Sequence, residues 1–212
     1  MRIVSEVFNM SSKKTLDQKT LFRLTLTALF IAVIIVMDFT PIGYITTGLF
    51  SITLLTIPVA LGAACTGVIG GAILGLVFGL TSFLQAFAIG YFIDPSAAVL
   101  FSENPAGYAI TCFVPRIIAG LVSALVFRIF EQRNKIGIPA FAVSACLVPI
   151  MNTFLFMTSF ALFYRNTQLG GASVMAVIIS ALTLNFLIEL SVTVIAGVVI
   201  NKTIYRYAKR FS

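Results

Sequence analysis

The sequence predicts an all-α membrane protein, with six transmembrane helices in one bundle and both termini in the cytoplasm. Three observations predict this fold class. The 212 residues are 59% hydrophobic and only 10% charged, with a mean hydropathy of +1.08. Six apolar runs are each close to the length that crosses a bilayer. Twelve of the fourteen basic residues flank these runs, in segments that an even number of spans places on one face.

The apolar runs are separated by short polar or glycine- and proline-containing breaks. We expect spans at about residues 24–39, 50–65, 68–88, 108–127, 138–164 and 173–200, with a loop at 89–107. Pro58 lies within the second run, which is therefore expected to be bent or partly re-entrant. Thr66-Gly67 forms the very short connection to the third run. The expected domains are a cytoplasmic N-terminal segment (1–22), a substrate-binding transmembrane domain (23–206) and a cytoplasmic tail (207–212).

Glycines recur at a four-residue interval in the third run. Gly71, Gly75 and Gly79 are in register with Gly67 just before the run. That interval places them on one helical face. Small residues on one face let two membrane helices approach closely, so this stripe predicts a packing surface.

Composition excludes several functions. Histidine is absent, and the three cysteines lie apart within apolar runs, so no metal site and no His-dependent protease is expected. No phosphate-binding motif and no nucleophile with a base is present, so the chain is expected not to be an enzyme. No cofactor is expected. The net charge of +7 lies at span ends, where it serves topology and contacts with lipid headgroups rather than nucleic acid.

The most informative residue is Arg116, about nine residues into the fourth run. At ~1.5 Å per residue its side chain starts ~14 Å deep in the bilayer. A charge at that depth costs at least about 2.5–3.5 kcal/mol on insertion scales, so it should face a polar cavity or a partner. The neighbouring Pro115 lacks an N–H and frees a backbone carbonyl, which adds polarity. Arg116 is therefore the first candidate for binding an anionic or strongly polar ligand, against the alternative of a structural ion pair.

Other polar side chains reach a similar depth on the last two runs. Asn152 and Asn185 are expected to line a pocket with Arg116, open to the outside. Glu189, one turn further in than Asn185, either pairs with Arg116 or serves as a proton site. The outer ends supply further candidate substrate-binding residues that could cover the pocket: Tyr44, Thr47, Gln85 and Asn104. With 20 phenylalanines in the chain, such a pocket suits a small organic molecule with an apolar body.

Several segments together resemble a known family. Ala28 and Ala32 match an Ala-xxx-Ala motif on the first helix, and residues 113–120 (FVPRIIAG) resemble a characteristic fourth-span segment. The run 57–63 (IPVALGA), which leads into the glycine-rich span, fits the same pattern. The chain thus resembles the substrate-binding S components of energy-coupling factor (ECF) vitamin transporters, and in particular their pantothenate and riboflavin group. One departure is Ala64-Cys65-Thr66-Gly67, where the family pattern has a Gly-Pro pair.

The resemblance implies a function and partners. An S component binds a vitamin from outside and docks on a membrane coupling subunit, here through Ala28 and Ala32, while two partner ATPases supply the energy. It also implies a multi-pass location in a bacterial plasma membrane. A carboxylate fits Arg116 best, which favours pantothenate; cobalamin, riboflavin and hydroxymethylpyrimidine stay open. The alternative of another class is a proton-coupled secondary transporter that uses Glu189.

Overall fold

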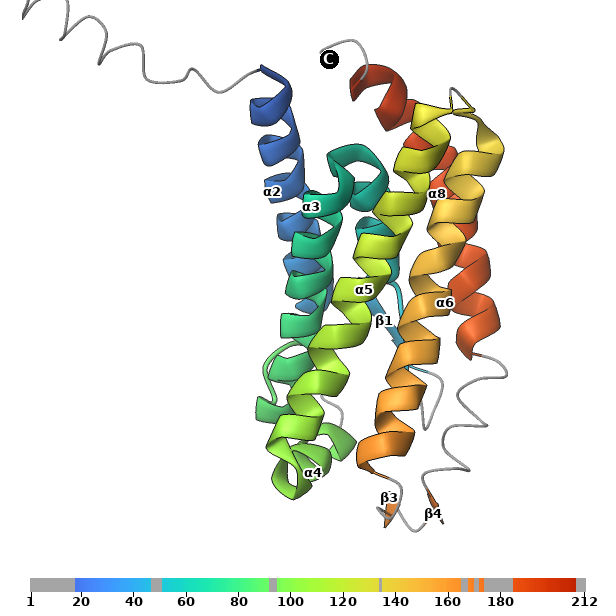
Figure 1. The fold of residues 1–212 in the computed structure, drawn as a ribbon. Helices are drawn as coiled ribbons and strands as arrows, with labels where there is room; N and C mark the ends of the chain where they lie inside the picture. The colour runs from blue at the N-terminus through green and yellow to red at the C-terminus, as the bar shows by residue number, and fades with distance from the viewer. Residues whose placement is uncertain are drawn as a thin grey trace, which may run out of the picture.

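The computed structural model describes residues 18–46, 51–91, 95–133, 135–164, 168–169, 172–173 and 185–208. Within these residues the chain is a helical bundle with two short β-hairpins (Figure 1). The helices are α2 (Gln18–Asp38), α3 (Thr56–Leu84), α4 (Pro95–Glu103), α5 (Pro105–Gln132), α6 (Ile138–Phe163) and α8 (Asn185–Ala208). Two single 3₁₀ turns are η1 (Pro41–Gly43) and η2 (Gln85–Phe87). β1 (Tyr44–Thr46) pairs antiparallel with β2 (Ser51–Thr53), and β3 (Gln168–Leu169) pairs with β4 (Ala172–Ser173).

Four helices of the described chain are long and apolar enough to cross a membrane. They are Thr20–Asp38, Thr56–Phe87, Pro105–Gln132 and Ile138–Phe163, and α8 adds a shorter apolar stretch, Phe186–Ile200. The predicted fourth and fifth spans are confirmed, each within five residues at both ends. The helical membrane class is therefore confirmed, at the level of four long spans and a shorter apolar helix.

α3 is two helical arms joined at Gly67. Gly67 has φ +82°, a left-handed conformation that glycine adopts without steric penalty. A side chain at Gly62 would collide with Leu74, although one straight helix would hold these residues ~18 Å apart along its axis. The chain therefore reverses at Gly67, as Figure 1 shows, and the predicted Thr66-Gly67 connection is confirmed.

The second run is shorter than predicted. Its first residues form β2, and the helix begins only at Thr56. Ile52 and Thr53 are β-branched and suit a strand, whereas Pro58 falls in the first helical turn, where its missing N–H has no partner to lose. The first arm of α3, residues 56–66, is ~16 Å long and does not cross a bilayer by itself.

The glycine stripe is a packing surface, as predicted, and its partner in the structure is α5. A Cβ at Gly71 would lie 2.6 Å from the carbonyl oxygen of Gly120, and one at Gly79 would lie 3.0 Å from that of Cys112. A Cβ at Gly75 would collide with the carbonyl of Arg116 itself. The second arm of α3 thus packs directly against the segment of α5 that carries Arg116.

Two further predicted boundaries differ from the structure. Residues 89–107 are not a simple loop, because they contain α4. The Tyr164 hydroxyl ties this segment to the end of α6, since it lies within hydrogen-bonding distance of the carbonyls of Leu100 (3.1 Å) and Asn104 (3.0 Å) and donates to them. The last predicted span does not begin at residue 173, because 172–173 form β4; α8 is described from Asn185 onward. The Gly170-Gly171 pair between β3 and β4 is a sequence signal for a two-residue hairpin loop, and the prediction missed it.

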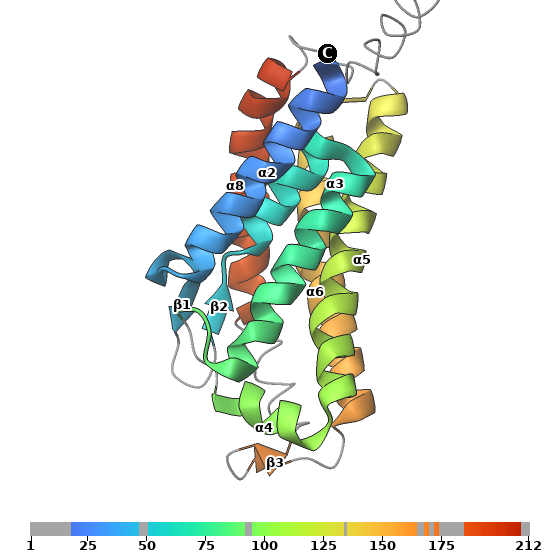
Figure 2. The same ribbon diagram turned by 90° about the vertical axis from the view of Figure 1, so that its left-hand side faces the viewer.

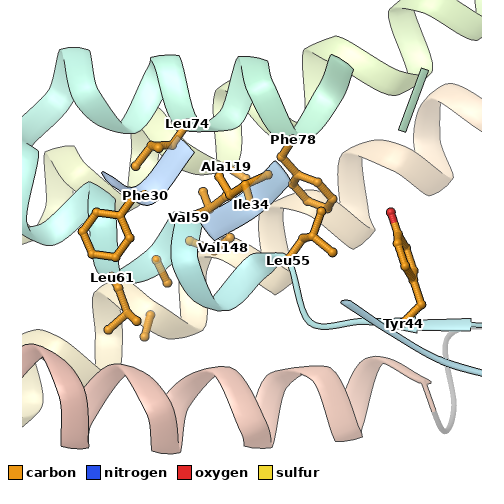
Figure 3. Packing of buried hydrophobic residues seen from close by; sticks show 12 residues of the cluster. Phe30, Ile34, Tyr44, Leu55, Val59, Leu61, Leu74, Phe78, Ala119 and Val148 are labelled. Atoms are coloured by element: carbon orange, nitrogen blue, oxygen red, sulfur yellow. The ribbon is translucent and has the colours of Figure 1, made fainter. Parts of the chain in front are cut away.

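The main core joins α2, both arms of α3, α5 and α6. Phe30, Ile34, Val59, Leu74 and Val148 are among its fully or nearly fully buried members, shown in Figure 3. Tyr44 closes one edge of this cluster, beside Leu55 and Phe78. The start of α2, the reversal of α3, the α5–α6 connection and the end of α8 lie at one end of the bundle, and α4 lies at the other (Figures 1 and 2).

Candidate functional site

Arg116 lies in the middle of α5 and its side chain is 9% exposed. Its Nη1 donates a hydrogen bond of 2.7 Å to the carbonyl of Thr111. That carbonyl is four residues before Pro115, which has no N–H to offer it. Pro115 leaves the Thr111 carbonyl without its helical donor, and the neighbouring Arg116 guanidinium donates to that carbonyl instead.

The rest of the guanidinium faces aromatic rings. Its central carbon lies 4.7 Å from the ring centroid of Phe156 on α6 and 5.5 Å from that of Phe78 on α3. Cation–π attraction stabilises the charge only partly in such a place. The Nε atom is buried and has no hydrogen-bond partner. One strong donor of the arginine is thus held in the bundle without an acceptor.

Two further side chains in the described residues share this property. Asn152 Oδ1 on α6 and Glu189 Oε1 on α8 are buried without a hydrogen-bond partner, and with Arg116 Nε they complete that set. Leaving a buried polar atom unpaired costs about 1–3 kcal/mol, and more for a charged group. Such atoms are uncommon in folded proteins and call for a functional explanation. All three belong to residues that the sequence predicts as candidates.

Arg116 interacts with the two helices that carry the other two residues. Asn152 lies one helical turn before Phe156, the ring that covers the Arg116 guanidinium. Arg116 interacts electrostatically with Tyr44 and with Glu189. No ion pair between Arg116 and Glu189 is found in the described part of the chain, and the Glu189 carboxyl instead lies within hydrogen-bonding reach of Thr56. The direct pairing considered from sequence is not what the structure contains.

A chain of hydrogen bonds borders this region. Gln85 Nε2 donates to the Tyr44 hydroxyl (2.8 Å), which donates to the Asp38 carboxylate (2.8 Å). Asp38 is 1% exposed. Burial raises the pKa of Tyr44, and so does the nearby Asp38 charge, so the hydroxyl keeps its proton and remains a donor. The bonds fix the β1–β2 hairpin to the ends of α2 and α3.

The other predicted substrate-binding residues have different outcomes. Asn104 caps α5, since its Oδ1 accepts from the Gly107 N–H at 2.9 Å, and it lies ~18 Å along the helix from Arg116. The structure does not bring it to the arginine. Thr47 lies outside the described residues. Asn185 is the first residue of α8, and its side chain lies outside the described part.

Sequence reasoning missed three polar residues near the site. In the sequence, Asp38 is only an acidic residue at the end of an apolar run, and nothing there indicates a contact with the site. Thr56 and Thr193 are fully buried, with their hydroxyl oxygens 3.1 Å apart, and join α3 to α8. Threonine is common in membrane helices, so neither residue stands out in the sequence.

Ala28 and Ala32 lie on an exposed face of α2. Large apolar neighbours on this helix are exposed as well, including Leu29 at 57% and Val36 at 60%. Among the described residues the two alanines do not pack inside the bundle. They form a smooth part of a surface that meets lipid or another protein.

The apolar helices and buried polar groups define a multi-pass membrane protein with unsatisfied hydrogen-bonding groups inside its bundle. The family model described as "ECF transporter, substrate-specific component" matches residues 22–201. The chain belongs to this family, whose members are non-enzymatic transport subunits that act with a substrate and an energy-coupling module. It is also 33% identical over 147 residues to the pantothenic acid transporter PanT of Lactococcus lactis subsp. cremoris (strain MG1363), and the match covers 66% of this chain and 72% of that relative.

Proposed function

We infer that this chain is the pantothenate-binding S component of an ECF importer. The observation that carries the proposal is the set of three unpartnered buried atoms: the donor Arg116 Nε and the acceptors Asn152 Oδ1 and Glu189 Oε1. Pantothenate has a carboxylate at one end, an amide in the middle and two hydroxyls at the other end. It therefore offers an acceptor for the arginine and donors for the two oxygens. The likeness to the lactococcal pantothenic acid transporter supports the same ligand.

The aromatic surroundings of the arginine favour such a ligand. A carboxylate that replaces water around a buried guanidinium gains a charge-assisted hydrogen bond in a medium of low dielectric constant. Phe78 and Phe156 exclude water on two sides of the guanidinium. The same rings offer apolar contact to the methyl groups of pantothenate.

The proposal includes six membrane crossings with both termini in the cytoplasm. The crossings are α2, β2 together with the first arm of α3, the second arm of α3, α5, α6 and α8. The start of α2, the end of α5 and the end of α8 lie at one end of the bundle (Figure 1), and the sequence carries its basic segments there, which supports that end as the cytoplasmic one. Asp38, Tyr44 and Gln85 then belong to the outer half, where the vitamin enters.

The partners follow from the family and from α2. Ala28 and Ala32 would dock on the membrane coupling subunit, and two ATPase subunits would supply the energy for release of the vitamin inside. An exposed face of small residues permits the close helix approach that such docking needs.

The test is calorimetry of the purified full-length protein with pantothenate, riboflavin, hydroxymethylpyrimidine and cobalamin. The proposal expects tight binding of pantothenate alone. Binding of another of these vitamins in its place would contradict the assignment of pantothenate but not the function as an S component. The isolated protein could also be tested for uptake in proteoliposomes under a proton gradient. Uptake that Glu189→Gln abolishes would contradict the dependence on an energy-coupling module and favour a secondary transporter.

A further inference from the structure

Glu189 has the unusual position of a buried carboxyl that its own bundle does not satisfy. It is 5% exposed on the second turn of α8, and its Oε1 has no partner. The Thr193 hydroxyl, one turn further along α8, is engaged with Thr56. Thr56 also reaches the Glu189 carboxyl, so the threonines can satisfy one carboxyl oxygen and not both.

A purely structural role explains this arrangement poorly. A structural carboxylate in a membrane protein is expected to pair with a cation or with enough donors to satisfy both oxygens. Arg116 interacts with Glu189 electrostatically, but its Nη1 is committed to Thr111 and its Nε points to no acceptor among the described residues. A guanidinium and a carboxyl group are thus held in one bundle, each with an unused hydrogen-bonding atom.

We propose that Glu189 accepts a hydrogen bond from a hydroxyl of the bound ligand and so fixes the orientation and specificity of binding. This inference rests on the proposed function. The ligand carboxylate lies at Arg116, and the hydroxyl end lies at Glu189. Arg116 attracts the ligand carboxylate, whereas the Glu189 oxygen can only accept a hydrogen bond from a donor, so the two groups favour one orientation.

The orientation explains why the two groups remain unpaired with each other. A direct salt bridge would satisfy the protein and leave nothing for a ligand that carries both an anion and hydroxyls. Holding acid and base apart makes binding depend on both ends of the ligand at once. A site built to bond a hydroxyl rejects an analogue without it much more strongly than an apolar pocket does.

The experiment compares, for each protein variant, the ratio of its affinities for two ligands that differ only in their hydroxyls. Calorimetry measures pantothenate and N-(3,3-dimethylbutanoyl)-β-alanine, the analogue in which both hydroxyls are replaced by hydrogen. The proteins are the wild type, Glu189→Met, which removes the acceptor at similar volume, and Glu189→Gln, which keeps an amide oxygen. Ser191→Ala, on the exposed side of the same helix, is the matched control.

The wild type should prefer pantothenate by about a hundredfold or more. Glu189→Met should bring that preference down at least about tenfold while binding of the deoxygenated analogue changes little, and Glu189→Gln should retain part of it. Ser191→Ala should match the wild type. Preservation of the full preference in a folded Glu189→Met protein, judged by its thermal unfolding, overturns this inference alone. Failure of the wild type to bind pantothenate overturns the proposed function and the inference together.

Discussion

The outward face of α2 and the α3–α5 interface use small residues in opposite ways. Only 17% of the most apolar stretch of α2 is buried, against 61% of that in α3. Ala28 and Ala32 are exposed, whereas Gly71, Gly75 and Gly79 hold the backbone of α5 at contact distance. The same four-residue spacing therefore serves an outside surface in one helix and an internal joint in the other. Spacing alone does not distinguish the two uses; burial does.

The largest expected effect is at the internal joint. Gly75→Leu places a side chain against the Arg116 carbonyl, a backbone atom that cannot move away without separating the helices. We expect a loss of about 3 kcal/mol or more in unfolding free energy, measured by thermal unfolding in detergent. Ile69→Phe adds bulk on the exposed side of the same arm and is the control, with little change expected. Equal stability of the two variants would show that the joint tolerates separation.

The second effect is at the outward face. Ala28→Trp with Ala32→Trp should leave pantothenate affinity within about twofold, because both positions lie outside the bundle, and should lower coupled uptake by about tenfold or more. Uptake is measured in proteoliposomes that also contain the energy-coupling module. Phe154→Trp with Leu162→Trp, two exposed positions on α6, is the control with uptake retained. Normal uptake by the α2 variant would leave this face as a lipid contact.

The smallest effect concerns the hydrogen bonds beside the site. Tyr44→Phe removes the hydroxyl that joins Asp38 to Gln85, so the β1–β2 hairpin is held less firmly beside the proposed binding site. We expect pantothenate affinity to fall by about three- to tenfold, measured by calorimetry. Tyr91→Phe, at an exposed tyrosine, should bind normally. A Tyr44→Phe protein with wild-type affinity would separate this chain of bonds from binding.

The sequence predicts the inner site better than its border, for a physical reason. A polar side chain inside an apolar run is costly, so Arg116, Asn152 and Glu189 stand out from the sequence alone. Gly67 and the glycine stripe are likewise readable, since turns and close helix contacts have few other solutions. The helix class and its long spans follow from the same apolar runs.

The border depends on contacts between distant segments. Nothing in the sequence near Asp38 indicates that Tyr44 will reach it, or that Gln85 will join them. Asn104 caps α5, as an asparagine directly before a proline at a helix start typically does, and its place over the ligand stays a prediction. The β1–β2 and β3–β4 hairpins are too short for a periodic pattern to reveal them.

The most direct test of the account is the charge recognition at Arg116. Calorimetry compares pantothenate with pantothenol, in which an alcohol replaces the carboxylate, on the wild type and on Arg116→Met. The account predicts that the wild type prefers pantothenate by about a hundredfold or more and that Arg116→Met, still folded, loses most of this preference. An unchanged preference in the folded variant would contradict the claim that the buried guanidinium holds the anionic end of the vitamin.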